Sequence, residues 1–167
     1  MITVISSSRR ETAAIGGVVA GWLNPGDTVV LTGELGGGKT ALVSGAVSAL
    51  GCADAVSSPT FAIVQEYEGP VPIAHADLYR LGSVQELFDF GFEELFDGTR
   101  VVFVEWGDRA LDVLPASYLH ISMQHRANPD ERLVELIAHG TDWIDRLVAI
   151  EVALDASLGI QRLKASQ

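Results

Sequence analysis

The chain contains little cysteine and few positively charged residues. Its only cysteine, Cys52, cannot form a disulfide within the chain, which suits a reducing compartment. Lysines and arginines number 11, against 22 aspartates and glutamates, and the formal net charge is −11. Because nucleic-acid affinity comes largely from cations that neutralise phosphates, direct and tight binding to DNA or RNA is not expected. An acidic surface is better suited to solubility or to docking on a basic protein partner.

Long hydrophobic runs are also missing. Nowhere do about 18 apolar residues follow one another, so we expect no membrane-spanning helix. Residues 1–20 contain Arg9, Arg10 and Glu11 and no long apolar block, so we expect no signal peptide. These absences predict a cytoplasmic protein. A length of 167 residues and a hydrophobic fraction of 48% are sufficient for a single domain with a sizeable core.

The most informative segment is the glycine-rich run at residues 33–40, which fits Gly-x-x-x-x-Gly-Lys-Ser/Thr, the pattern of a phosphate-binding loop. The preceding residues 28–32 are apolar and β-branched, as in a buried parallel strand. Residues 41–50 are typical of a helix with a small-residue face, which Gly51 ends. A glycine-rich turn that fits by chance is the alternative. We favour the phosphate loop because Lys39, one of only two lysines, stands where the pattern requires it.

The residue types in this loop have a physical reason. Glycines let successive backbone amides point at a phosphate, and a helix that begins near Gly38 adds its positive end. Lys39 can reach the terminal phosphates, and the Thr40 hydroxyl can bind Mg²⁺. The predicted nucleotide-binding residues of the loop are Gly33, Glu34, Leu35, Gly36, Gly37, Gly38, Lys39, Thr40 and Ala41.

Two carboxylates follow predicted strands. Residues 101–104 are apolar and precede Glu105, and a strand within residues 70–77 ends at Asp77. In open α/β sheets, ligands bind beyond the carboxyl ends of the strands, and Mg²⁺ takes one or two protein oxygens together with phosphate and water. Thr40 with Glu105, or Thr40 with Asp77, could supply those oxygens, and a solvated strand end is the alternative for either acid. His75 and Asp77 are too few residues to specify a metal site.

Two loops near the motif have alternative interpretations. Residues 8–11 have the form of a capping box, with Ser8 as N-cap of a helix over residues 12–23 and Glu11 reaching back. Alternatively, this segment, including Thr12, lies against a nucleotide base. Residues 58–60 form a hydroxyl-rich turn, which can be an ordinary turn or a switch that senses the γ-phosphate.

The rest of the chain carries less chemistry. A second capping box at residues 83–86 predicts a short helix. Residues 118–123 and 132–137 predict an antiparallel hairpin, and residues 142–158 predict an amphipathic helix that packs on the core. Three histidines have no convincing partner in the sequence and are expected to be structural or exposed: His120, His125 and His139.

Taken together, these motifs resemble the TsaE (YjeE) family of small bacterial ATPases over roughly residues 5–138. The chain departs from the family pattern at Ala76, often Phe, and at Gly107, usually Pro, and the helix after residue 141 is not part of the pattern. The matching motifs are the phosphate loop at residues 33–40, Ser-Pro-Thr-Phe at 58–61, His-x-Asp-Leu-Tyr-Arg-Leu at 75–81, and Glu105-Trp106.

The resemblance implies a fold and a role. The fold would be an α/β, three-layer αβα P-loop nucleotide hydrolase with a mixed, mainly parallel sheet, formed by a domain at residues 1–140 and a C-terminal helical extension at 141–167. The role would be in making N6-threonylcarbamoyladenosine at position 37 of tRNA. Family members hydrolyse ATP while docked on the proteins TsaB and TsaD, and TsaD performs the transfer to tRNA. The partners would then hold the tRNA, in agreement with the negative net charge of this chain.

These expectations define a mechanism with ATP and Mg²⁺ as cofactors. Lys39 neutralises charge on the phosphates, Thr40 and Glu105 hold Mg²⁺, and Asp77 orients or deprotonates the attacking water or contacts the metal through water. Thr60 reports the γ-phosphate. Thr12 and Trp106 complete the predicted nucleotide-binding set, and Arg80 or a partner supplies any arginine finger, so hydrolysis by the chain alone is expected to be weak.

Three other functions are known for chains with a phosphate loop of this kind. A small-molecule kinase needs an arginine-bearing lid, and a nucleotide-gated binding module would bind without turnover. A GTPase is disfavoured because no Asn-Lys-x-Asp guanine-reading motif is present.

Overall fold

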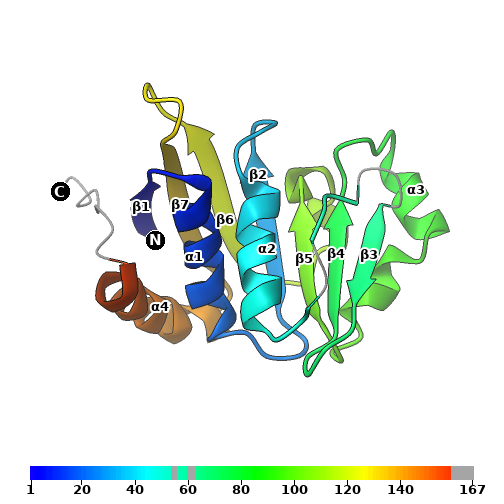
Figure 1. Cartoon of the computed structure of the whole chain (residues 1–167). Helices are drawn as coiled ribbons and strands as arrows, with labels where there is room; N and C mark the ends of the chain where they lie inside the picture. The colour runs from blue at the N-terminus through cyan, green and yellow to red at the C-terminus, as the bar shows by residue number, and fades with distance from the viewer. Residues whose placement is uncertain (54–55, 60–62, 159–167) are drawn as a thin grey trace.

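The computed structural model of the chain describes residues 1–53, 56–59 and 63–158. A single mixed sheet runs through it, with strand order β1-β7-β6-β2-β5-β4-β3 (Figure 1). The central strand β2 is parallel to both neighbours, β5 and β6, and β4 is parallel to β5. The pairs β1–β7, β6–β7 and β3–β4 are antiparallel. The strands are β1 Ile2–Ser6, β2 Thr28–Gly33, β3 Val64–Tyr67, β4 Ile73–Asp77, β5 Val101–Glu105, β6 Tyr118–His125 and β7 Arg132–His139.

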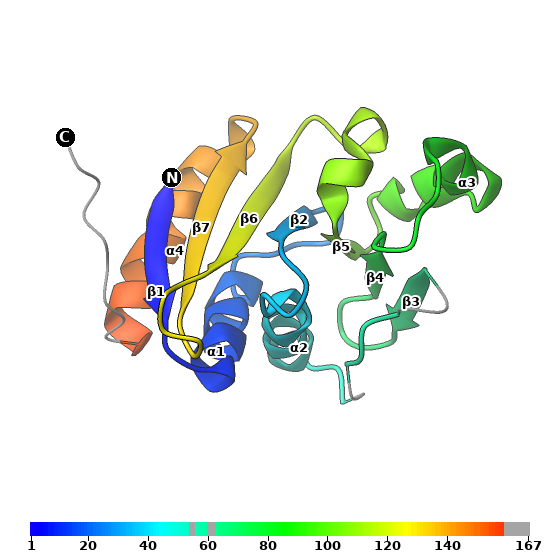
Figure 2. The same ribbon diagram turned by 90° about the horizontal axis from the view of Figure 1, so that it is seen from above.

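Helices cover both faces of the sheet. On one face, α1, α2 and α4 share a core with the strands, and on the other face α3 and a short 3-10 helix, η1, cover β4 and β5 (Figure 2). The expected α/β fold with a mixed sheet is therefore confirmed. Within the described ranges, none of the helices combines the length and the apolarity that crossing a membrane requires. The helices are α1 Arg9–Ala20, α2 Lys39–Ala49, α3 Val84–Asp89, α4 Asp142–Leu158, η1 Phe92–Phe96, η2 Gly107–Arg109 and η3 Leu111–Val113.

Helix α1 begins earlier than expected. Ser8 caps it, since its hydroxyl accepts a hydrogen bond from the Glu11 amide at 3.2 Å, and the helix begins at Arg9 instead of residue 12. The Glu11 carboxylate accepts from the Ser7 amide at 2.7 Å, one residue before the cap. After Ala20 the chain continues in hydrogen-bonded turns, which explains why the sequence pattern extends to residue 23.

The second capping box is only half formed. Ser83 is the N-cap of α3, but its side chain makes no capping hydrogen bond. The Glu86 amide donates to the Ser83 carbonyl at 3.2 Å instead, and the Gly82 amide donates to the Glu86 carboxylate at 3.4 Å. The prediction that the Ser83 hydroxyl caps this helix is therefore wrong, although the helix begins where it was expected.

Helices α1 and α2 approach each other closely through glycine. A Cβ added at Gly16 would lie 2.0 Å from the Leu42 carbonyl oxygen, and one added at Gly45 would lie 1.8 Å from the Ala13 carbonyl oxygen. Backbone therefore contacts backbone where these helices cross. This contact holds the beginning of α1 beside the loop that precedes α2.

The C-terminal helix α4 packs against α1 and β7. Trp143, Leu147, Ile150 and Leu154 are buried in the core that these elements share. Arg146 binds both carboxylate oxygens of Asp27, at 2.5 and 2.8 Å. The helix thus has the core contacts expected from its amphipathic pattern.

Candidate functional site

The glycine-rich loop joins the central strand β2 to α2, in the order that the motif requires. Gly33 has φ +130°, and a Cβ there would lie 2.0 Å from the Met123 carbonyl oxygen of β6. Only glycine fits this backbone and this space. Helix α2 begins directly after Gly38, which is its N-cap. The positive end of α2 therefore faces the loop.

Lys39 is bound to its own loop. The side chain is 4% exposed, and its ammonium donates hydrogen bonds to the carbonyls of Gly33 at 2.8 Å and Glu34 at 2.9 Å. The ammonium also lies 4.0 Å from the centre of the Trp106 ring. Burial lowers the pKa of Lys39 below 10.5, and the nearby carboxylates, Glu105 foremost, oppose that shift. A phosphate could replace the two carbonyls as the partner of this cation.

Asp77 and Glu105 lie side by side because their strands are parallel and in register. The Thr40 hydroxyl donates to Glu105 Oε1 at 2.8 Å, so the two expected metal-binding groups already touch. His75 Nε2 lies 2.9 Å from the same oxygen, and both side chains are buried. His75 is therefore a partner of Glu105 and not of Asp77, a role that the sequence pattern did not predict.

Asp77 is 8% exposed, and among the described residues two groups donate hydrogen bonds to its carboxylate. It accepts one from the Ser58 hydroxyl and one from the Tyr79 amide at 2.9 Å. Ser58 belongs to the segment expected to act as a switch, so the structure connects that segment to this carboxylate. Thr60, the predicted γ-phosphate sensor, lies outside the described residues.

The donor set fits a hard divalent cation of the Mg²⁺ type. In the described part of the chain, no group of three or more His, Cys, Asp or Glu side chains is arranged to hold a metal ion. A hydroxyl and a carboxylate beside a phosphate loop suffice for Mg²⁺, because this ion keeps several waters and takes phosphate oxygens as ligands.

These groups open on a cleft of about 950 Å³, here called the phosphate cleft. Thr12 lines it beside the loop, but its hydroxyl is already bonded to Ser6, at 2.7 Å, and to the Ser8 carbonyl, at 3.2 Å. Gly33 and Glu34 do not line this cleft and instead line a second one on the other side of the loop. The predicted residues that do line the phosphate cleft are Thr12, Leu35, Gly36, Gly37, Gly38, Lys39, Thr40, Ala41, Asp77, Glu105 and Trp106.

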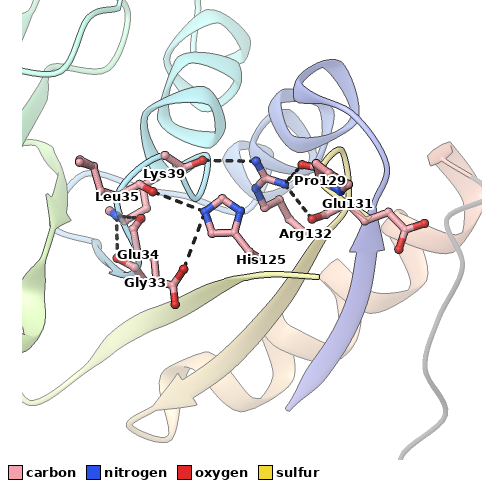
Figure 3. Close-up of polar contacts among 9 residues, drawn as sticks. Gly33, Glu34, Leu35, Lys39, His125, Pro129, Glu131 and Arg132 are labelled. Carbon is pink, nitrogen blue, oxygen red and sulfur yellow. Dashed lines mark hydrogen bonds and ion pairs between the residues drawn. The ribbon is translucent and has the colours of Figure 1, made fainter. Parts of the chain in front are cut away.

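The β6–β7 hairpin supports the loop from outside (Figure 3). His125 Nε2 lies 3.4 Å from the Leu35 carbonyl, and an Arg132 nitrogen donates to the Gly36 carbonyl at 3.4 Å. Arg132 also lines the phosphate cleft, together with Arg9 and Arg80. Neither Arg9 nor Arg132 was predicted as a site residue. Arg9 lies in the first turn of α1, and Arg132 reaches the loop from a hairpin about a hundred residues away, so no local motif marks either arginine.

The three histidines without expected partners have partners in the structure. His120 Nε2 lies 2.7 Å from the Thr32 hydroxyl, and the His139 ring stacks on Tyr118 at 4.3 Å between centres. His125 contacts the loop. All three are structural contacts across strands or to the loop, which a linear pattern does not show.

Comparison with known proteins agrees with this geometry. The family model described as "Threonylcarbamoyl adenosine biosynthesis protein TsaE" matches residues 6–134. The tRNA threonylcarbamoyladenosine biosynthesis protein TsaE of Treponema pallidum is 38% identical over 129 residues, 77% of this chain and 96% of that protein. The Bacillus subtilis protein of the same name is 40% identical over 135 residues, 80% of this chain and 84% of that protein. The crystal structure of Bacillus subtilis YdiB superposes with a TM-score of 0.76 at 29% identity, covering 91% of this chain and 97% of that one.

The family model covers the phosphate loop, both strand-end carboxylates, and His125 and Arg132, the two hairpin residues that contact the loop. The chain belongs to the TsaE family of tRNA threonylcarbamoyladenosine biosynthesis proteins.

Proposed function

We propose that this chain binds and hydrolyses ATP with Mg²⁺ as one component of the machinery that makes N6-threonylcarbamoyladenosine at position 37 of tRNA. It would act in the cytoplasm on a complex of TsaB and TsaD. The observation that carries the proposal is the contact of the Thr40 hydroxyl with Glu105 at 2.8 Å, beside Lys39 and the phosphate loop. A hydroxyl, a carboxylate and an ammonium converge there on the place where the terminal phosphates of a nucleotide would lie.

Nucleotide binding requires Lys39 to exchange partners. Its ammonium would leave the carbonyls of Gly33 and Glu34 and contact the β- and γ-phosphates. Charge-assisted hydrogen bonds to phosphate would then replace hydrogen bonds to two neutral carbonyls. The loop amides and the positive end of α2 hold the same phosphates. Thr12 and Trp106 lie at the walls of the phosphate cleft and would confine the rest of the nucleotide.

Mg²⁺ would be held by Thr40 and Glu105. When bound, it neutralises the negative charge that develops on the transferred phosphoryl group. His75 fixes the Glu105 carboxylate through Oε1, so that carboxylate needs little reorganisation when the cation arrives. Glu105 is 3% exposed, and this burial would strengthen its attraction to the cation.

Asp77 is the residue we propose to orient or deprotonate the attacking water, or to contact the metal through water. The Tyr79 amide and the Ser58 hydroxyl fix its carboxylate at the edge of the phosphate cleft. Movement of the segment that contains Ser58 would change the position of Asp77. In this proposal Thr60, in the same segment, senses whether the γ-phosphate is present.

Hydrolysis by the isolated chain should be weak. Arg80 lines the phosphate cleft and is the arginine of this chain that we propose as a finger, unless a partner supplies one. The net charge of −11 favours docking on a protein over direct contact with tRNA, so the partners would hold the tRNA.

The first test is nucleotide binding. We would measure ATP affinity by isothermal titration calorimetry with Mg²⁺ and with EDTA, for wild type, Thr40→Val and the control Thr32→Val. Thr32 carries the same side chain on β2, but its hydroxyl bonds His120 outside the phosphate cleft. Wild type and Thr32→Val should bind about tenfold more tightly with Mg²⁺, a difference of about 1.4 kcal/mol.

Thr40→Val should lose that difference while its affinity in EDTA stays near wild type. Equal Mg²⁺ dependence in Thr40→Val and wild type would contradict the proposed metal site. ATP consumption that depends on an added small metabolite would favour a kinase instead, and binding without turnover in the presence of the partners would favour a nucleotide-gated module.

A further inference from the structure

A second cleft of about 830 Å³ lies on the other side of the phosphate loop. Strands β2, β6 and β7 form its floor, and η2 and η3 form part of its rim. Two pairs of aromatic rings line it. The Tyr118 and His139 rings are stacked within 9° of parallel, and the ring centres of Tyr79 and Trp106 are 5.1 Å apart. The groups proposed to bind phosphate and Mg²⁺, namely Lys39, Thr40, Asp77 and Glu105, do not line this cleft.

The two clefts differ in their charged groups. The phosphate cleft is lined by four cationic side chains, Arg9, Lys39, Arg80 and Arg132, and by three carboxylates, Asp77, Glu105 and Asp130. Over the described part of the chain, the second cleft is lined by two carboxylates, Glu34 and Asp108, and by no lysine or arginine. Burial and the neighbouring His139 lower the pKa of His120 below 6.5, which disfavours a positive charge on that ring. The second cleft therefore repels phosphates and attracts cations.

Apolar side chains on the rim remain in contact with solvent. Leu35 is 68% exposed and Leu111 is 59% exposed, and both line the second cleft. Exposed apolar groups gathered around a polar-rimmed hollow are typical of an interaction surface. Aromatic walls with carboxylates at the rim recognise an alkyl chain that ends in a positive charge, through cation–π and charge-assisted contacts.

We propose that the second cleft receives a lysine or arginine side chain of a protein partner, with the aromatic rings around its alkyl chain and Glu34 and Asp108 at its charge. This inference rests on the proposed function and assigns a surface and a chemistry to its partner contact. A nucleic acid does not fit, since its phosphates would face two carboxylates without an opposing cation in the lining.

The position of the second cleft explains how such a contact would stimulate hydrolysis. Leu35 and Trp106 line both clefts. Trp106 has a left-handed backbone with φ +60° and lies 4.0 Å from the Lys39 ammonium, and Glu34 supplies one of the carbonyls that hold Lys39. An occupant that pulls on Glu34 or Trp106 would weaken the hold on Lys39 and favour its movement to the phosphates. The partner would then raise turnover as well as bind.

The test compares two apolar-to-arginine variants at positions with similar surface exposure. Leu111→Arg places a positive charge at the rim of the second cleft, where it would repel the positively charged side chain of the partner. The control Ile144→Arg places the same charge on α4, where Ile144 is 56% exposed. Stimulation of ATP hydrolysis would be titrated with the TsaB–TsaD complex, and complex formation would be followed by biolayer interferometry. Leu111→Arg should need at least about tenfold more complex for half-maximal stimulation, while Ile144→Arg behaves as wild type.

Asp108→Asn, a milder variant, should weaken the salt dependence of complex formation because one charge is removed. Circular dichroism and ATP binding without partner should be unchanged in Leu111→Arg and Asp108→Asn, which separates docking from folding. Stimulation of Leu111→Arg at wild-type concentrations of the complex would overturn the inference and leave the proposed function intact. If wild type is neither bound nor stimulated by the complex, both are overturned.

Discussion

The contact between α1 and α2 should make two adjacent glycines respond in opposite directions to the same substitution. Gly16 faces α2, and a Cβ there would lie 2.0 Å from the Leu42 carbonyl oxygen. Gly17, the next residue of the same helix, would meet only ordinary contacts, at 3.7 Å from the Gly45 carbonyl oxygen and 3.8 Å from the Ala49 Cβ. We predict that Gly16→Ala destabilises the protein and that Gly17→Ala stabilises it.

The expected magnitudes follow from two opposing terms. Replacing glycine by alanine within a helix gains up to about 1 kcal/mol at either position. At Gly16 the added methyl overlaps backbone that no rotamer change can move, and overpacking of this kind costs about 3 kcal/mol at the upper end of its usual range. The net change is a loss of about 2 kcal/mol for Gly16→Ala and a gain of up to about 1 kcal/mol for Gly17→Ala. At about 2–4 °C per kcal/mol, the two melting temperatures should differ by about 6–12 °C.

Differential scanning calorimetry and urea unfolding of both variants would measure this difference. Because α1 carries Thr12 at the phosphate cleft, Gly16→Ala should also weaken ATP binding by shifting α1 away from the loop, whereas Gly17→Ala should not. Equal stability of the two variants would refute the close helix contact and the account of how α1 is placed beside the loop.

Two further predictions concern titration and the C-terminal helix. Burial and His139 hold the pKa of His120 below its usual 6.5, against weaker opposite effects of Asp108 and Glu135, so the unfolded chain takes up a proton there before the folded one. The free energy of unfolding should therefore fall as the pH falls below about 6.5. In urea unfolding from about pH 7 to 5, His120→Gln should show a smaller fall than wild type. The same pH dependence in both proteins would contradict this prediction. Arg146 lies 3.8 Å from the Trp143 ring centre and binds Asp27, so Arg146→Met should lower the free energy of unfolding by about 1–3 kcal/mol and Asp27→Asn should add little in that background.

The sequence was sufficient for those parts of the site that are local in the chain. The strand, loop and helix around Lys39 follow one another within residues 28–50, and each has its own signal in residue type. Asp77 and Glu105 could be expected near the loop because both end parallel strands, and such strand ends share one edge of a sheet.

Contacts that depend on strand register could not be predicted. His75 lies two residues before Asp77 on the same face of β4, and the pairing of β4 with β5 brings it to Glu105. The spacing of these residues in the sequence does not predict that pairing. Arg132 reaches Gly36 only because β7 lies next to β6 and the hairpin returns to the loop. The sequence also did not predict that Glu34 lines the second cleft instead of the phosphate cleft, because the local backbone and not the motif decides which cleft it faces.

The central claim is that Lys39 in the phosphate loop supports ATP hydrolysis that the TsaB–TsaD complex stimulates. The most direct measurement is the rate of phosphate release by wild type and Lys39→Ala, each with and without that complex. We predict low turnover by wild type alone, a clear increase with the complex, and loss of turnover in Lys39→Ala under both conditions. Full turnover by wild type alone, or stimulation that survives in Lys39→Ala, would contradict the account.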